Sequence, residues 1–280
     1  MNTQMQAASA LGRVVDLVRD LRKRCSWDAA QTRESLRPYL VEEVLELDQS
    51  IGEGKTGEMR DELGDMMLHL AFQIVIGEEK SEFGPEDVTN AVERKMWRRH
   101  PHLFSESGAP HEQSHSTLSP TPGVSPGFAG TGHQGWERTK QAERRTSGRG
   151  VLDGLPPSLP TLVMSHRLQE RAAGVGFDWP DHTGPRDKIR EELGEVEEEL
   201  EAGADRARLE HEVGDLLFAV VNLARKTGVD ARAALEKANG RFVTRFRSIE
   251  RLAGERNIDV ATAGLETLDR LWDEAKRETK

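Results

Sequence analysis

The chain has 280 residues, of which 36% are hydrophobic and 31% are charged. This length suits one large domain or two of ordinary size. With 49 Asp and Glu against 39 Lys and Arg, the net charge is −10, which argues against the basic surface needed to bind nucleic acid or anionic lipid. Cys25 is the single cysteine, so an intrachain disulfide and a cysteine-rich zinc site are excluded.

The sequence contains no stretch of the roughly 20 apolar residues that a membrane-spanning helix needs. The best run, residues 216–221, ends at Asn222. Residues 1–10 have neither the charged nor the apolar region of a secretory signal. We therefore expect no membrane association and a reducing location, the cytoplasm.

Hydrophobic residues recur at helical spacing in both halves of the chain, in steps of four, three and four. Alternating β-branched runs are missing, as is any strand-helix-strand rhythm. Prolines at positions 38, 85, 101, 180 and 185 are expected at helix boundaries, because proline disrupts a helix interior. The sequence therefore predicts an all-α fold. The periodic stretches are Met59, Leu63, Met66 and Leu70, and Ile189, Leu193, Val196 and Leu200.

Ser, Pro and Gly dominate the middle of the chain. They make up 16 of the 31 residues in 105–135, a composition that buries too little apolar surface to offset the entropy of ordering. We expect a helical domain over residues 1–104, a linker and connecting segment over 105–150, and a second helical domain over 151–280.

An acidic pattern occurs twice, and the two copies lie 149 to 150 residues apart. Tryptophan-aspartate pairs precede both copies, and pairs of basic residues follow both. Such self-similarity indicates a duplicated domain. The acids are Glu42, Glu43, Glu46, Asp61, Glu62 and Asp65 in the first copy, and Glu191, Glu192, Glu195, Glu212 and Asp215 in the second; the flanking pairs are Trp27-Asp28 and Asp178-Trp179, and Lys95 with Arg99 and Arg241 with Arg245.

Residues three or four apart share one helix face, so Glu192 and Glu195 point the same way. Glu212 and Asp215 do so on the next helix, and antiparallel packing would bring the four acids together. Like charges about 5 Å apart repel by roughly 3 kcal/mol per pair at an effective dielectric near 20, and a divalent cation would turn this repulsion into binding energy. We expect the packing to run through Leu193, Val196, Leu216 and Val220.

The predicted ligands are all oxygens, which favours Mg²⁺, with Mn²⁺ as second choice, over zinc or copper. Gly64 and Gly214 lie between the last two acids of each copy, although glycine inside a helix costs about 1 kcal/mol relative to alanine. We infer that another backbone or a ligand approaches closely there. The matching acids of the first copy are Glu43, Glu46, Glu62 and Asp65.

Basic residues supply a second part of the predicted site. Arg241 and Arg245 lie four residues apart on one helix face, and Lys188 precedes Glu192 by one turn. These cations could bind an anionic substrate opposite its metal, and a polyphosphate satisfies both demands. The other interpretation is surface ion pairs worth at most about 1 kcal/mol.

These residues resemble the MazG-type nucleoside triphosphate pyrophosphohydrolases of the all-α NTP pyrophosphatase class. The resemblance covers nearly the whole chain and rests on both acidic copies together with four flanking motifs. The motifs are Cys25-Ser26-Trp27-Asp28-x-x-Gln31-Thr32, Leu36-Arg37-Pro38-Tyr39, Arg98-Arg99-His100-Pro101-His102-Leu103-Phe104, and Arg171-Ala172-Ala173-x-Val175-Gly176-Phe177-Asp178-Trp179.

The resemblance implies Mg²⁺-dependent hydrolysis of NTPs and dNTPs between the α and β phosphates to monophosphate and pyrophosphate. It also implies loose base selectivity, a homodimer, and a second domain that is the main catalytic one. Which acid is the general base stays open, and Trp272 could stack on a base or only pack between helices. The implied metal-binding and catalytic acids are Glu192, Glu195, Glu212 and Asp215, and the implied nucleotide contacts are Lys188, Arg241, Arg245 and Trp272.

The same residues admit other interpretations. Gly54-Lys55-Thr56 resembles the end of a P-loop, but Gln49 stands where the first glycine belongs, so we expect a turn, matched by Ala202-Gly203-Ala204. A di-iron bundle needs Glu-x-x-His on two helices, and only Glu112-x-x-His115 in the linker matches. The remaining alternative is a non-catalytic helical module that binds a structural cation or a regulatory protein partner.

Overall fold

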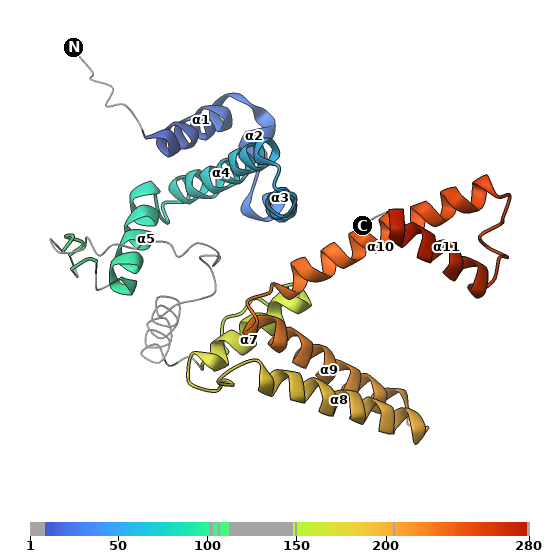
Figure 1. Ribbon diagram of the computed structural model, residues 1–280. Helices are drawn as coiled ribbons and strands as arrows, with labels where there is room; N and C mark the ends of the chain where they lie inside the picture. Colours follow the sequence, from blue (N-terminus) through green and yellow to red (C-terminus); the bar gives the residue numbers. More distant parts are fainter. Residues whose placement is uncertain are drawn as a thin grey trace, which may run out of the picture. The chain divides into compact units, whose positions relative to one another are not determined.

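The computed structural model describes residues 9–100, 103–105, 107–111, 148, 150–203 and 205–278. Every regular element within these ranges is a helix, and the β pairing they contain is one isolated bridge between Phe104 and Pro110. The predicted all-α fold is therefore confirmed (Figure 1). The helices are α1 (Ala10–Arg24), α2 (Ser26–Ala30), α3 (Arg33–Glu53), α4 (Thr56–Glu79), α5 (Pro85–Arg99), α7 (Thr161–Ala173), α8 (Thr183–Glu201), α9 (Arg206–Lys226), α10 (Ala231–Glu255) and α11 (Leu265–Glu278).

The chain divides into two compact units, Met1–Thr117 and Leu118–Lys280. We call them the first and second unit. Most of the predicted linker, residues 105–150, lies outside the described residues, and so do Glu112 and His115. The domain boundaries at residues 104 and 150 therefore stay predictions.

Local chemistry explains where several helices begin. The Thr32 hydroxyl accepts a hydrogen bond from Ser35 N at 3.1 Å at the start of α3, and the Asp205 carboxylate accepts one from Arg208 N at 3.0 Å at the start of α9. Pro85 is the first residue of α5, as expected. The expectation for Pro38 is wrong: it lies in the second turn of α3, where the missing donor removes one backbone hydrogen bond near the helix end.

The two turns that link the acidic helices have the same backbone form. Gly54 has φ +69° between α3 and α4, and Gly203 has φ +65° between α8 and α9. This left-handed conformation suits glycine, which has no side chain to clash. Gly54-Lys55-Thr56 is therefore a turn at a helix end and not part of a P-loop.

The first unit has its hydrophobic core between α1, α3 and α4. Val18, Leu36 and Phe72 are at most 3% exposed and represent the three helices. Arg19 pairs with Glu78 at 2.6 Å and Arg22 pairs with Glu79 at 2.7 Å, which ties α1 to the end of α4. The middle turns of α3 and α4 pack along each other. The first acidic copy lies on these turns.

A buried arginine explains part of the motif around Trp27-Asp28. Arg22 donates from Nη1 to the carbonyl oxygens of Asp28, at 2.6 Å, and Gln31, at 3.1 Å. Its side chain is 8% exposed, so these carbonyls receive a charged donor away from solvent. This part of the motif orders the chain between α1 and α3.

The second unit contains two packed helix pairs. α8 packs along α9, and α10 packs on α11 through a core that includes Ile249, Ala253 and Leu271. The Gln169 side chain donates from Nε2 to Phe218 O at 2.8 Å, which ties α7 to α9. In Figure 1, α11 and the adjoining part of α10 extend away from α8 and α9.

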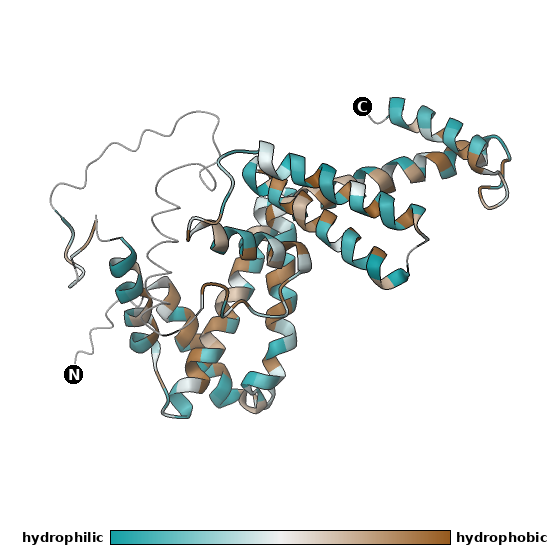
Figure 2. Ribbon diagram, turned by 90° about the horizontal axis from the view of Figure 1, so that it is seen from below, coloured by the Kyte–Doolittle hydropathy of each residue, from teal (hydrophilic) through white to brown (hydrophobic). Residues whose placement is uncertain are grey.

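The predicted packing between α8 and α9 is only partly correct. Val196 is 8% exposed, as expected, but Leu193 is 45% exposed and Val220 is 44% exposed. Hydrophobic spacing marks the face of a helix that avoids water, but it does not say which neighbour covers it. Figure 2 shows hydrophobic and hydrophilic residues interspersed along the helices. None of the described helices is both long and apolar enough to cross a membrane.

Candidate functional site

Three acids of the second copy meet between α8 and α9. Glu192 and Glu195 of α8 and Glu212 of α9 each place one carboxylate oxygen within 4.8 Å of the other two. The hydrogen bond to Asp205 fixes the start of α9, and Gly203 lets the chain reverse, so two turns of different helices come face to face. The predicted convergence of acids therefore occurs for three of the four residues.

Lys188 forms part of this acidic cluster. Its Nζ lies 2.5 Å from Glu192 Oε1 and 2.8 Å from Glu191 Oε1, and these hydrogen bonds raise the pKa of Lys188. The hydrogen bond from Lys188 lowers the pKa of Glu192, whereas the hydrogen bond with Glu192 raises the pKa of Glu195. The two glutamates thus differ in acidity although they lie one turn apart, because the lysine is bound to Glu192.

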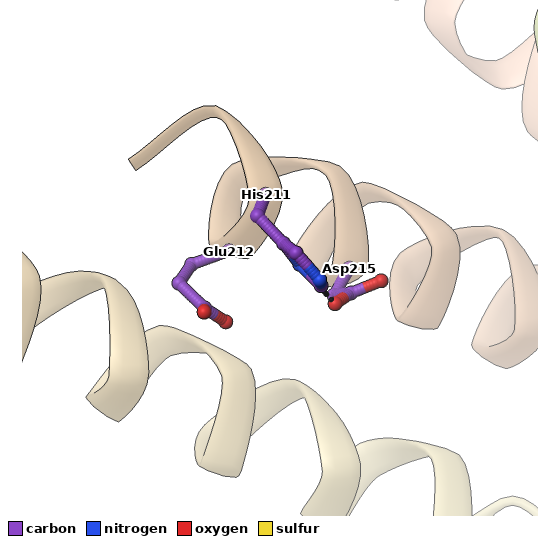
Figure 3. Close-up of side chains that lie close together, drawn as sticks. All are labelled: His211, Glu212 and Asp215. Atoms are coloured by element: carbon purple, nitrogen blue, oxygen red, sulfur yellow. Dashed lines mark ion pairs between the residues drawn. The ribbon is translucent and has the colours of Figure 1, made fainter. Parts of the chain in front are cut away.

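The fourth predicted acid, Asp215, lies beside a histidine. His211 Nδ1 is 2.9 Å from Asp215 Oδ2, and the charge of Asp215 raises the pKa of His211. Figure 3 shows these two side chains next to each other on α9, with Glu212 turned toward the neighbouring helix. His211, Glu212 and Asp215 form a second set of ligand atoms within 4.8 Å of one another. Glu212 therefore belongs to both sets.

The first unit repeats the arrangement with a different composition. Glu43 of α3 and Glu62 and Asp65 of α4 bring carboxylate oxygens within 4.8 Å of one another, while Glu46 lies outside this set. Burial and the charge of Asp65 raise the pKa of Glu43, and burial and the charge of Glu46 raise the pKa of Glu62. Tyr39 occupies the position that corresponds to Lys188.

Both carboxylate sets fit a hard divalent cation. They consist of oxygen donors from two helices, as Mg²⁺ prefers. Glu192 is 4% exposed, and its Oε2 atom is buried without a hydrogen-bond partner. A buried carboxylate oxygen with no donor is costly, and a cation would satisfy it.

The predicted nucleotide contacts Arg241 and Arg245 lie on α10 and Trp272 lies on α11, and in Figure 1 α11 extends away from the acidic helices α8 and α9. Arg241 and Arg245 line a shallow groove along α10. The Arg245 guanidinium carbon lies 5.8 Å from the ring centroid of Trp272, and that ring is 5.4 Å from the Phe242 ring. Trp272 is thus a packing aromatic of the α10–α11 core, with its role toward a base still a prediction. Lys188 thus lies among the predicted acids, whereas Arg241 and Arg245 lie with Trp272 on the other helix pair.

Sequence reasoning missed two contributors that helical spacing could have revealed. His211 precedes Asp215 by four residues, and Lys237 precedes Arg241 by four and lines the same groove. The inference of a close neighbour at Gly64 and Gly214 finds no support within the described chain, because a Cβ added at either position would have no atom within 4 Å apart from adjacent residues and the nearby backbone of its own helix. A ligand or a second chain remains the predicted neighbour.

Comparison with known proteins agrees with this geometry. A family profile described as the MazG nucleotide pyrophosphohydrolase domain matches residues 31–104 and 182–248. The chain is 37% identical to the nucleoside triphosphate pyrophosphohydrolase of Escherichia coli (strain K12), over 95% of each chain. It is 38% identical to the nucleoside triphosphate pyrophosphohydrolase/pyrophosphatase MazG of Thermotoga maritima, over 90% of this chain and 89% of the relative.

The matched ranges contain all the helices that carry the two carboxylate sets, α3 and α4 in the first unit and α8 and α9 in the second. Only part of the α10–α11 pair is included, because the second range ends at residue 248. The sequence similarity therefore covers the paired acidic helices. This chain belongs to the MazG nucleotide pyrophosphohydrolase family.

Proposed function

We propose that this chain hydrolyses NTPs and dNTPs between the α and β phosphates, releasing the monophosphate and pyrophosphate, with Mg²⁺ and with loose base selectivity. The observation that carries the proposal is the convergence of Glu192, Glu195 and Glu212 from two helices, with one buried oxygen of Glu192 lacking a partner. Membership in a pyrophosphohydrolase family supports the same reaction.

Glu192, Glu195 and Glu212 would hold the cation, with Asp215 at the edge of the site. When bound, Mg²⁺ would supply positive charge against the polyphosphate and make a water molecule more acidic. Lys188 keeps Glu192 ionised through its 2.5 Å contact, so this acid needs no deprotonation before it binds metal. Glu195, whose pKa is raised, is the acid most ready to hold or release a proton here.

The chain's cations and aromatic side chain would bind the rest of the substrate. Arg241 and Arg245 present two guanidinium groups along one groove, which suits phosphate oxygens. One face of Trp272 could stack on a base, a contact that tolerates different bases because every base has a π face. Attack by water in line with the leaving pyrophosphate needs no covalent enzyme intermediate.

We assign the activity mainly to the second unit. Lys188 and Trp272 lie in this unit, whereas the first copy has Tyr39 in place of the lysine. The acids of the first unit could bind metal, but this unit has no lysine at the position of Tyr39 that could bind a phosphate. The first unit is therefore weaker or regulatory in this proposal.

We further propose that the protein works as a homodimer in the cytoplasm. Leu193, Leu217 and Val220 of α8 and α9 are 44 to 57% exposed, and exposed apolar side chains that gather in one patch mark an interface. A second copy covering these side chains could also bring Arg245 and Trp272 of one chain to the acids of the other. Light scattering tests the dimer, and Leu217→Asp should yield monomers; a wild-type monomer would contradict this part.

The activity is tested by phosphate release from each NTP with Mg²⁺ and an added inorganic pyrophosphatase. Glu192→Gln should abolish release, Glu43→Gln should retain most of it, and Glu197→Gln, on the exposed face of α8, is the matched control. Absence of release by wild type, with Glu192→Gln changing only the binding of a protein partner, would favour the non-catalytic alternative. Equal losses in Glu43→Gln and Glu192→Gln would contradict the division between units.

A further inference from the structure

His211 makes the two carboxylate sites of this chain chemically different. Its imidazole lies on the same exposed stretch of α9 as Glu212 and Asp215, with its side chain 71% exposed and that of Asp215 48% exposed. The ligand atoms of the three residues lie within 4.8 Å of one another (Figure 3). A nitrogen donor therefore stands at the edge of a set that otherwise contains only oxygens.

The internal repeat provides the comparison. Asp61 occupies the position of His211 in the first copy, 150 residues earlier. Asp65 belongs to the all-carboxylate set of the first unit, whereas Asp215 groups with His211 and Glu212. At this position the second unit thus has a nitrogen donor, whereas the first unit has an acid.

Two further observations point to a cation between these groups. Glu212 belongs both to the set with His211 and to the set with Glu192, so the two sets are continuous. Glu192, which shares the second set with Glu212, is 4% exposed, and its Oε2 is buried without a hydrogen-bond partner.

We propose that His211 is an additional metal ligand that gives the second-unit site a preference for Mn²⁺ or another first-row transition ion over Mg²⁺. Imidazole nitrogen suits these ions, whereas Mg²⁺ selects oxygen. The first-unit site, with Asp61 in this place, keeps the preference for Mg²⁺. The inference rests on the proposed function, since it requires that the carboxylates of α8 and α9 bind a divalent cation.

The test uses the full chain with one site silenced at a time. In a Glu43→Gln/Glu62→Gln background, Mn²⁺ is titrated and followed by electron paramagnetic resonance, and Mg²⁺ is then added as competitor. His211→Asp, which copies the first unit, should lower the Mn²⁺ preference about tenfold, and His211→Gln should lower it too. The converse change, Asp61→His in a Glu192→Gln/Glu195→Gln background, should raise the preference of the first-unit site.

Pulsed electron paramagnetic resonance on the Mn²⁺-loaded protein gives a readout that is independent of activity. Wild type should show coupling to an imidazole nitrogen, and His211→Asp should lose it while circular dichroism stays unchanged. Mn²⁺ binding without nitrogen coupling, and with equal preference in wild type and His211→Asp, would overturn the inference and leave the proposed function standing. No Mn²⁺ or Mg²⁺ binding by wild type would overturn both.

Discussion

Replacing one glutamate by glutamine in each unit should change stability in opposite directions when no metal is added. In the first unit, burial and then the charges of neighbouring acids raise the pKa of Glu43, so its ionised form is unfavourable in the folded protein. The carboxylate oxygens of this set lie within 4.8 Å of one another, and two unit charges at that limit repel by about 3.5 kcal/mol at an effective dielectric near 20. Solvent screening reduces the net effect to about 1 kcal/mol. Glu43→Gln should therefore stabilise the metal-free protein by about this amount.

In the second unit, the same substitution should change the stability in the opposite direction. Lys188 lowers the pKa of Glu192, so ionisation of Glu192 is favourable in the folded protein. Glu192→Gln removes an ion pair in which the glutamate side chain is 5% exposed and the lysine 40% exposed, and should destabilise the protein by about 1 kcal/mol. Two copies of one motif thus respond oppositely to one substitution, because only the second copy has a lysine.

Scanning calorimetry at neutral pH with EDTA measures both changes, each expected to be about 3 °C in the midpoint of the affected unit. A cation at 100 times its dissociation constant should stabilise wild type by about 2.7 kcal/mol, and each variant should lose this gain in its own unit only. Glu197→Gln is the control on α8. Shifts of the same sign in the two variants would refute the electrostatic reasoning.

Three further predictions concern residues around the site. Hydrogen bonds from Arg225 and Lys226 outweigh the effect of burial and lower the pKa of Asp178, so Asp178→Asn should cost about 2 kcal/mol in urea denaturation at pH 7. This loss should shrink as the pH falls below about 4, the ordinary Asp value, toward the lower folded-state pKa. Gly214→Ala should stabilise the helix by about 1 kcal/mol if nothing approaches it, whereas a loss of stability or of nucleotide binding would reveal the inferred neighbour. Arg171 is 4% exposed and donates to two backbone carbonyls at 2.9 and 2.7 Å, so Arg171→Met should lower the unfolding free energy by about 2 kcal/mol without changing metal affinity; unchanged stability would contradict this.

Features that depend on neighbours along the chain could be predicted from the sequence. The helices follow from hydrophobic spacing and from capping residues such as Thr32 and Asp205, and the turn at Gly54 follows from a glycine between two periodic stretches. The shared face of Glu192 and Glu195 follows from the helical repeat itself. Because the acidic pattern occurs twice, it could be distinguished from the many other acids in the chain.

The helical repeat fixes which residues share a face, but it does not fix how far one helix is rotated or shifted along its neighbour. Only the packing of α3 on α4 and of α8 on α9 decided that Glu46 lies outside the first set and that Asp215 lies outside the set of Glu192, Glu195 and Glu212. Packing likewise left Leu193 exposed and placed Arg245 beside Trp272 on a separate helix pair. The sequence of each helix taken alone does not determine these rotations, because they are set by the sum of all side-chain contacts between the helices.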